Sequence, residues 1–172
     1  MNIVGYKEVV ICMVLGAMSH FATGQAVPKI PETYGWTSAE EYHRDLPEIK
    51  KCLHYLCIAP LADTIGRSVV NAYVLEWLSG SPELSVDIDT RSLPFLAENE
   101  ELIFPVIHGM ALYQLEHPKE KDNVVLHAKG LKVLAALAES DAELKKAPYL
   151  REIFRAAHRK KLESWVCSRF NA

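Results

Sequence analysis

Apolar residues recur at helical spacing along most of the chain, and only one short stretch alternates with the period of two typical of a strand. The helical pattern covers residues 45–58, 61–78, 99–116, 122–139 and 148–166. Helices that each carry one apolar face must bury it against one another. We therefore expect an all-α fold, a single domain of five or six antiparallel helices packed as a bundle.

Proline and capping residues set the expected ends of the first helices. Thr37 or Ser38 precedes Ala39-Glu40-Glu41, which is typical of a helix start with acidic residues in its first turn. Pro47 is predicted to end this short helix, and Asp45 to cap a second one.

Pro105 leaves two alternatives open in the segment 99–116, which begins at Asn99-Glu100-Glu101. It either kinks one long helix or marks the first turn of a shorter one. The start of this helix is therefore not fixed by the pattern.

The stretch 83–94 is the one candidate for a strand, because Leu84, Val86 and Ile88 alternate with polar residues. A lone strand has no partner, so we expect an extended loop that crosses the helices. The Asp87-Ile88-Asp89 spacing resembles part of a cation site. It lacks the other acidic positions and the glycine of a calcium loop, which favours a solvated turn.

The N-terminus has the pattern of a secretory signal. Residues 9–18 are apolar and uncharged, and small residues follow at Ala22, Gly24 and Ala26. The apolar stretch is about half of the roughly 20 residues that a membrane-spanning helix needs. We expect residues 1–26 to be a cleaved signal peptide; the alternative is a buried or membrane-associated N-terminal helix.

The remainder of the chain has the composition of one globular domain, with 49% hydrophobic and 24% charged residues overall. Residues 27–36 contain two prolines and a glycine, which predicts an extended lead-in. Residues 37–172 are then the helical domain, which is long enough to be stable on its own core.

Three cysteines follow the predicted signal. Cys52 and Cys57 are about 8 Å apart along a helix, beyond the ~7 Å limit on Cα separation for a disulfide. A bridge from Cys167 to either one is geometrically open, but free cysteines that act as small hydrophobes are favoured. His54 and Cys57 share a helix face, yet two ligands do not complete a zinc site. We expect no metal and no cofactor.

Two polar residues stand out in otherwise apolar helices. His108 lies beside Gly109, which could leave room for a ligand, and Glu76 is the analogous acid in the helix 61–78. If the two met in space, a His/Glu pair could perform acid–base chemistry, so both are candidate catalytic residues. The residues expected to line a binding groove between the helices 61–78 and 99–116 are Tyr73, Trp77, His108 and Tyr113.

Charge is distributed unevenly along the chain. Residues 145–172 carry a net charge of +6, whereas residues 27–144 carry −9. Arg151, Arg155 and Arg159 form a row with a spacing of four on the last predicted helix. This row is either a strip for an anionic partner or a face that docks on the acidic body or is solvated. A pI near 6.2 makes nucleic acid an unsuitable partner.

A resemblance covers residues 75–118. The helix that ends near Trp77, the loop with Pro82 and the helix capped by Asn99 resemble small bacterial proteins of unknown function that carry signal peptides. The matching residues further along are Gly109, Tyr113, Leu115 and Glu116. The resemblance implies an exported helical domain and supplies no activity.

The sequence contains no catalytic, phosphate-binding or metal-binding signature. We therefore expect an exported protein, periplasmic or secreted, that acts as a non-enzymatic binding or interaction module. Its partner would be a protein or a small ligand of the cell envelope, and no transmembrane span would remain after cleavage. The alternative is a small hydrolase-like enzyme that uses His108 and Glu76.

Overall fold

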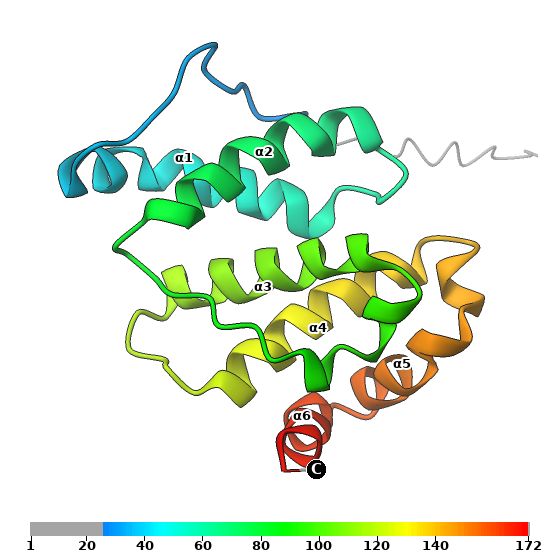
Figure 1. Ribbon diagram of the computed structural model, residues 1–172. Coiled ribbons are helices and arrows are strands. Elements are labelled where there is room, and N and C mark those ends of the chain that lie inside the picture. The colour runs from blue at the N-terminus through cyan, green and yellow to red at the C-terminus, as the bar shows by residue number, and fades with distance from the viewer. Residues whose placement is uncertain (1–25, 172) are drawn as a thin grey trace, which may run out of the picture.

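Six α-helices, with short 3-10 turns in two of the connections between them, make up the fold of the computed structural model, which describes residues 26–171 (Figure 1). No strand occurs in this range, so the predicted single all-α domain is confirmed. The predicted signal peptide lies outside the described residues except for Ala26. Within the described range no helix is both long and apolar enough to cross a membrane. The helices are α1 (Ala39–Ile58), α2 (Thr64–Gly80), α3 (Ile103–Glu116), α4 (Asn123–Glu139), α5 (Arg151–His158) and α6 (Leu162–Phe170).

Helix α1 runs through Pro47, so the predicted break between two helices is wrong. A proline inside a helix costs about 3 kcal/mol, and contacts on the turns before it oppose this cost. Ser38 and Glu41 form a capping box at the helix start. The Trp36 indole donates to Asp45 over 2.8 Å, and Trp77 donates to the Tyr42 carbonyl over 3.2 Å.

The segment after α2 is the extended loop that the alternating pattern predicted. Leu84 is buried against α1 and α2, and Val86 and Ile88 are half-buried further along the loop. The loop then descends along the face of α3 through the 3-10 turns η1 (Thr90–Ser92) and η2 (Pro94–Ala97) (Figure 1). It therefore connects the two halves of the core.

Helix α3 starts at Ile103, which settles the question raised by Pro105 in favour of a shorter helix. Asn99 caps the preceding 3-10 turn η3 (Glu100–Leu102) by accepting a hydrogen bond from the Glu101 amide over 3.2 Å. Pro105 then falls in the first turn of α3, where no amide hydrogen bond is needed.

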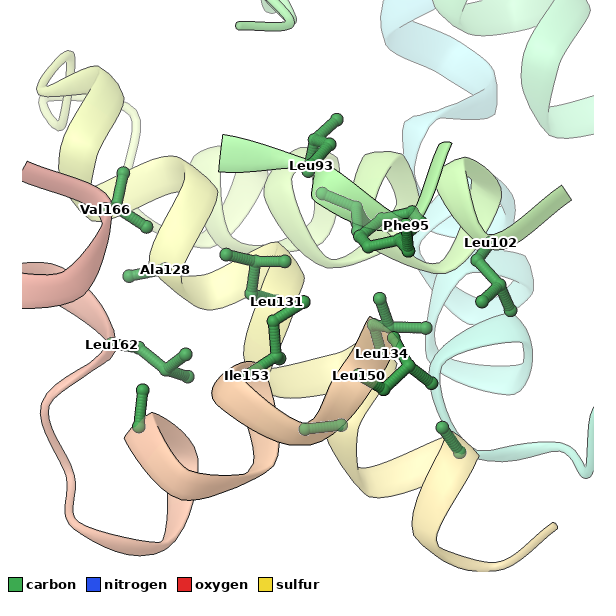
Figure 2. Packing of buried hydrophobic residues seen from close by; sticks show 14 of the residues in the cluster. Leu93, Phe95, Leu102, Ala128, Leu131, Leu134, Leu150, Ile153, Leu162 and Val166 are labelled. Atoms are coloured by element: carbon green, nitrogen blue, oxygen red, sulfur yellow. The ribbon is translucent and has the colours of Figure 1, made fainter. Parts of the chain in front are cut away.

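The core has two parts that meet at α3. One part lies between α1, α2 and the Ala111–Leu115 side of α3, and the other lies between α3, α4, α5 and α6. Figure 2 shows the second part, where Leu131 of α4, Ile153 of α5 and Val166 of α6 point into one shared interior. The α3–α4 pair has the most extensive helix–helix contact of the fold.

The predicted last helix, residues 148–166, is in fact two helices, α5 and α6. The chain reverses at Lys160, whose φ of 55° is the only positive value among non-glycine residues in the described range. The Lys161 amide donates to the Ala156 carbonyl and the Lys160 amide to the Ala157 carbonyl, over 2.8 and 2.9 Å. This is the Schellman arrangement that ends many helices, here without its usual glycine.

Candidate functional site

Two of the four residues predicted to line a binding groove belong to the core instead. Tyr73 and Trp77 are 1% and 0% exposed between α1 and α2. The lead-in packs Tyr34 and Trp36 onto Tyr73, with ring centroids 4.9 and 5.4 Å away. Their role in the structure is therefore to close the α1–α2 interior.

Tyr113 lies at the other end of α3 and is half-buried. Its ring stacks on His117 at 4.2 Å between centroids, and the Lys129 ammonium lies 5.0 Å from its centre. The structure therefore does not bring Tyr113 together with His108, and His108 is the one of the four that lines the cleft described next.

This cleft of about 390 Å³ lies between α2 and the start of α3, and we call it the α2–α3 cleft. It lies between the two helices named in the prediction, but of the four predicted residues it is lined by His108 and not by Tyr73, Trp77 or Tyr113. Helix α1 packs closely against both α2 and α3, whereas α2 and α3 are not a closely packed pair among the described helices. The residues that line the cleft are Leu61, Thr64, Arg67, Ser68, Asn71, Asn99, Glu101, Leu102, Phe104, Pro105, His108 and Leu144.

Arg67 is the principal charged group of the α2–α3 cleft, and only 8% of its surface is exposed. Its Nη1 donates to the carbonyls of Leu56 and Ala59 over 2.8 and 2.7 Å, at the end of α1. The last carbonyls of a helix have no amide partner within it, and the negative end of the helix dipole lies at the same place. A cation such as the Arg67 guanidinium is therefore favoured at the end of α1. None of the ion pairs of residues 26–171 includes Arg67.

His108 faces Arg67 and Asn71 from α3. Its Nε2 lies 2.7 Å from Oδ1 of Asn71, one helical turn after Arg67. Burial, assisted by the nearby Arg67 charge, lowers the pKa of His108 to about 3. The ring is therefore neutral at pH 7, with the proton on Nε2 donated to Asn71, and Nδ1 is an acceptor.

Nδ1 of His108 is a buried polar atom without a hydrogen-bond partner in the described chain. The only other such side-chain atom in residues 26–171 is Oε1 of Gln114. His127 provides the contrast, because its Nδ1 donates to the Asn123 carbonyl over 2.9 Å and its Nε2 accepts from the Asp89 amide over 3.0 Å. Both ring nitrogens of His127 therefore have hydrogen-bond partners, whereas only Nε2 of His108 has one.

The predicted catalytic pair is not assembled. Glu76 is exposed, and it lies about 140° around α2 from Asn71, the residue that contacts His108. Glu101 is the one acidic residue that lines the α2–α3 cleft, and it is exposed in the 3-10 turn η3 that precedes α3. A histidine with a pKa near 3 binds a proton poorly at neutral pH, so the arrangement suits hydrogen bonding better than proton transfer.

Gly109 does not leave room for a ligand, so this expectation is wrong. A Cβ at Gly109 would lie 2.8 Å from Val133 and 2.9 Å from Cα of Gly130. The space beside the glycine is occupied by α4, which crosses α3 at this point.

The cysteines and the acidic loop have no ligand-binding arrangement. Cys52, Cys57 and Cys167 are all free, as favoured from the sequence. Asp87 accepts a hydrogen bond from Asn123 over 3.0 Å, and Asp89 pairs with Arg91. Among residues 26–171 no cluster of three or more His, Cys, Asp or Glu side chains is placed to hold a metal ion.

The predicted arginine row lies on a different part of the molecule from the α2–α3 cleft, and none of its three residues lines that cleft. Arg151 and Arg155 of α5, and Arg159 directly after its last residue, are all exposed. Arg155 and Arg159 line a second groove, whereas Arg151 does not.

Sequence reasoning missed Arg67 and Asn71. Their signal was a basic and an amide residue four positions apart, on one face of an apolar helix. No protein family, curated protein or solved structure matches this chain. The functional conclusions therefore depend on the geometry of the site itself.

Proposed function

We propose that the protein is an exported, non-catalytic binding module whose α2–α3 cleft holds a small carboxylate-bearing ligand that also carries a hydroxyl group. The observation that supports this most directly is Arg67, a nearly buried cation that lines the cleft and has no carboxylate within ion-pair distance in the described chain. Asp63, one turn earlier, acts on Arg67 only at longer range. A buried arginine is usually paired, because charge removed from water is costly. A ligand carboxylate would supply the missing partner.

The polar neighbours of Arg67 favour a hydroxyl on the same ligand. The neutral His108 has an unused acceptor at Nδ1, and Asn71 is held by the bond to Nε2. Nδ1 is buried beside the cleft, so a ligand hydroxyl would reach it by displacing the side chains that cover it. A volume of about 390 Å³ lies at the low end of the roughly 300–1,000 Å³ range of small-molecule sites. These features support a compact ligand with few polar groups.

Catalysis by His108 and Glu76 is the weaker alternative. The acid is exposed on another face of α2, and the low pKa of His108 opposes proton uptake at neutral pH. Binding requires only the groups that the cleft already presents.

The binding proposal is tested by thermal shift and calorimetry with a panel of C2–C6 hydroxycarboxylates. We expect at least one member to raise Tm and to bind with a measurable Kd. Ser68→Phe should block binding, since Ser68 is exposed and lines the cleft. Ser79→Phe is the matched control, because Ser79 is also exposed on α2 and bonds a preceding carbonyl, but does not line the cleft. A panel without a binder, or equal binding to both variants, would reject the proposal.

The export part of the proposal has a separate test. The apolar stretch and small residues before Val27 support cleavage there, and the resemblance over residues 75–118 would place the product in a bacterial envelope or outside the cell. N-terminal sequencing of protein recovered from its native cells should begin at residue 25 or 27. A sequence that begins at Met1 would remove the basis for export.

A further inference from the structure

A second groove, of about 590 Å³, lies between α5 and α6, and it shares no lining residue with the α2–α3 cleft. We call it the α5–α6 groove. Each helix contributes one face, with members spaced three or four residues apart. Its lining residues are Glu152, Arg155, Ala156, Arg159, Lys161, Ser164, Trp165, Ser168 and Arg169.

The groove carries uncompensated positive charge. Arg169 is paired across it with Glu152, the only acid among the lining residues. Arg155, Arg159 and Lys161 are exposed, and none of them takes part in the ion pairs of residues 26–171. The acidic body of the chain therefore does not neutralise these three cations.

One wall of the groove is aromatic. The half-buried Trp165 lies on the groove-facing side of α6, and the Arg169 guanidinium lies 5.0 Å from its ring centre. Two serine hydroxyls, Ser164 and Ser168, flank this ring along α6. The Ser168 hydroxyl donates to the Trp165 carbonyl over 2.7 Å, so the groove combines positive charge, the Ser164 hydroxyl and a half-buried aromatic ring.

A membrane surface fits the groove poorly. Peripheral membrane binding combines cations with apolar side chains that enter the bilayer. The large hydrophobic residues that are exposed in the described range all precede α3 in the chain and lie outside α5 and α6: Val27, Tyr34, Ile58, Ile65 and Val69. The cationic end therefore lacks the apolar component.

The spacing of the cations matches the repeat of an extended chain. Arg155 and Arg159 are about 6 Å apart along the axis of α5, from the rise of a helix over four residues. Alternate side chains of an extended peptide are about 6.6–6.8 Å apart on one side. Arginine also binds carboxylates through two parallel hydrogen bonds, which gives the pairing a defined geometry.

We propose that the α5–α6 groove binds an extended acidic segment of a partner protein. Carboxylates at alternate positions of that segment pair with Arg155 and Arg159, and Lys161 accommodates a further acid at the end of the groove. The Trp165 ring supports the backbone between them. This site is independent of the α2–α3 cleft.

The test uses the full chain and a synthetic acetylated peptide, Glu-Thr-Glu-Thr-Glu-Thr-Glu, in calorimetry at low salt. Peptides with glutamine for glutamate, and with the four glutamates adjacent, control for charge and spacing. The protein variant is Arg155→Gln/Arg159→Gln. Its matched control is Lys145→Gln/Lys146→Gln, which removes the same charge from exposed residues outside the groove.

We expect the alternating peptide to bind, and to bind about tenfold more weakly to the arginine variant while the lysine variant changes less than twofold. The glutamine peptide should not bind, and the peptide with adjacent glutamates should bind several-fold more weakly. The proposal is overturned if the alternating peptide does not bind or if both variants weaken it equally. It is also overturned if the two acidic peptides bind alike, or if inorganic phosphate or phosphatidylglycerol vesicles bind this groove and the peptide does not.

Discussion

Gly109 of α3 and Gly130 of α4 face each other where the two helices cross. A Cβ on Gly109 would lie 2.9 Å from Cα of Gly130, and a Cβ on Gly130 would lie 2.5 Å from the Val106 carbonyl oxygen. Both distances are shorter than a normal contact and involve backbone atoms, which cannot move away as a flexible side chain can. The two glycines therefore set the distance between the most extensively packed pair of helices.

The first prediction concerns this crossing. Gly109→Ala and Gly130→Ala should each lower the free energy of unfolding by about 1–3 kcal/mol, because overpacking outweighs the roughly 1 kcal/mol gain in helix propensity. Urea denaturation followed by circular dichroism measures the change. Gly35→Ala is the control, since nothing lies within 4 Å of its added Cβ and no glycine in the described range has a positive φ. Unchanged stability in both helix variants would show that the crossing is not this close.

The second prediction concerns pH. Burial lowers the pKa of His108 to about 3, against about 6.5 in the unfolded chain. Between these values the unfolded state binds a proton that the folded state does not, so stability falls as the pH falls. From pH 6.5 to pH 5 this single residue should remove about 2 kcal/mol from the free energy of unfolding, at about 1.4 kcal/mol per pH unit.

His108→Gln tests this dependence, since glutamine can still donate to Asn71 and does not titrate. The variant should lose about 2 kcal/mol less than the wild type over the same pH interval. Ser79→Ala, an exposed substitution on α2, should retain the full pH dependence. Parallel pH profiles for the wild type and His108→Gln would contradict the buried, neutral state of the ring.

Much of the fold follows from the apolar pattern, and the errors have identifiable causes. The spacing of apolar residues correctly predicted the helical segments of α2, α3 and α4 and the extended loop, because each of them buries one continuous face. It failed at Pro47, where the local cost of proline is opposed by contacts from Trp36 and Trp77 that come from outside the helix. Because Trp36 and Trp77 lie outside the helix, the local sequence around Pro47 does not predict these contacts.

The candidate site was predictable in part. His108 stood out as a polar residue in an apolar helix, and it lines the cleft between the two helices that were named, whereas Tyr73, Trp77 and Tyr113 do not. The pattern did not identify Arg67, because a basic residue in a helix is normally assigned to the solvated face. The burial of Arg67 depends on the two carbonyls at the end of α1, which become neighbours only after the chain turns back.

The third prediction concerns the free thiols. Cys52 is buried, Cys57 is half-buried and Cys167 is exposed. Burial raises the pKa of both the Cys52 and the Cys57 thiol to about 12, so very little of the reactive thiolate forms at pH 8. Iodoacetamide should therefore modify Cys167 in the folded protein, and should modify the other two only after unfolding in urea.

Mass spectrometry of tryptic peptides locates the modified cysteines in this experiment. The urea-treated sample is the control for peptide recovery, and there all three positions should be labelled. Rapid labelling of Cys52 under native conditions would contradict its burial. Protection of Cys167 without added reductant would indicate a disulfide in place of a free thiol.

The last prediction concerns the turn between α5 and α6. Lys160 adopts a φ of 55°, where a residue with a Cβ costs roughly 1–2 kcal/mol and glycine has no such cost. Lys160→Gly should therefore raise the free energy of unfolding by about 0.5–1 kcal/mol, after the greater flexibility of glycine in the unfolded chain is subtracted. Lys146→Gly is the control, because Lys146 is an exposed lysine without a positive φ, and there the same flexibility should leave stability unchanged or lower.

Lys160 does not line the α5–α6 groove, so peptide binding should be preserved in the stabilised variant. A loss of stability for Lys160→Gly equal to that of the control would mean that the chain does not reverse at this residue, and that α5 and α6 form one continuous helix.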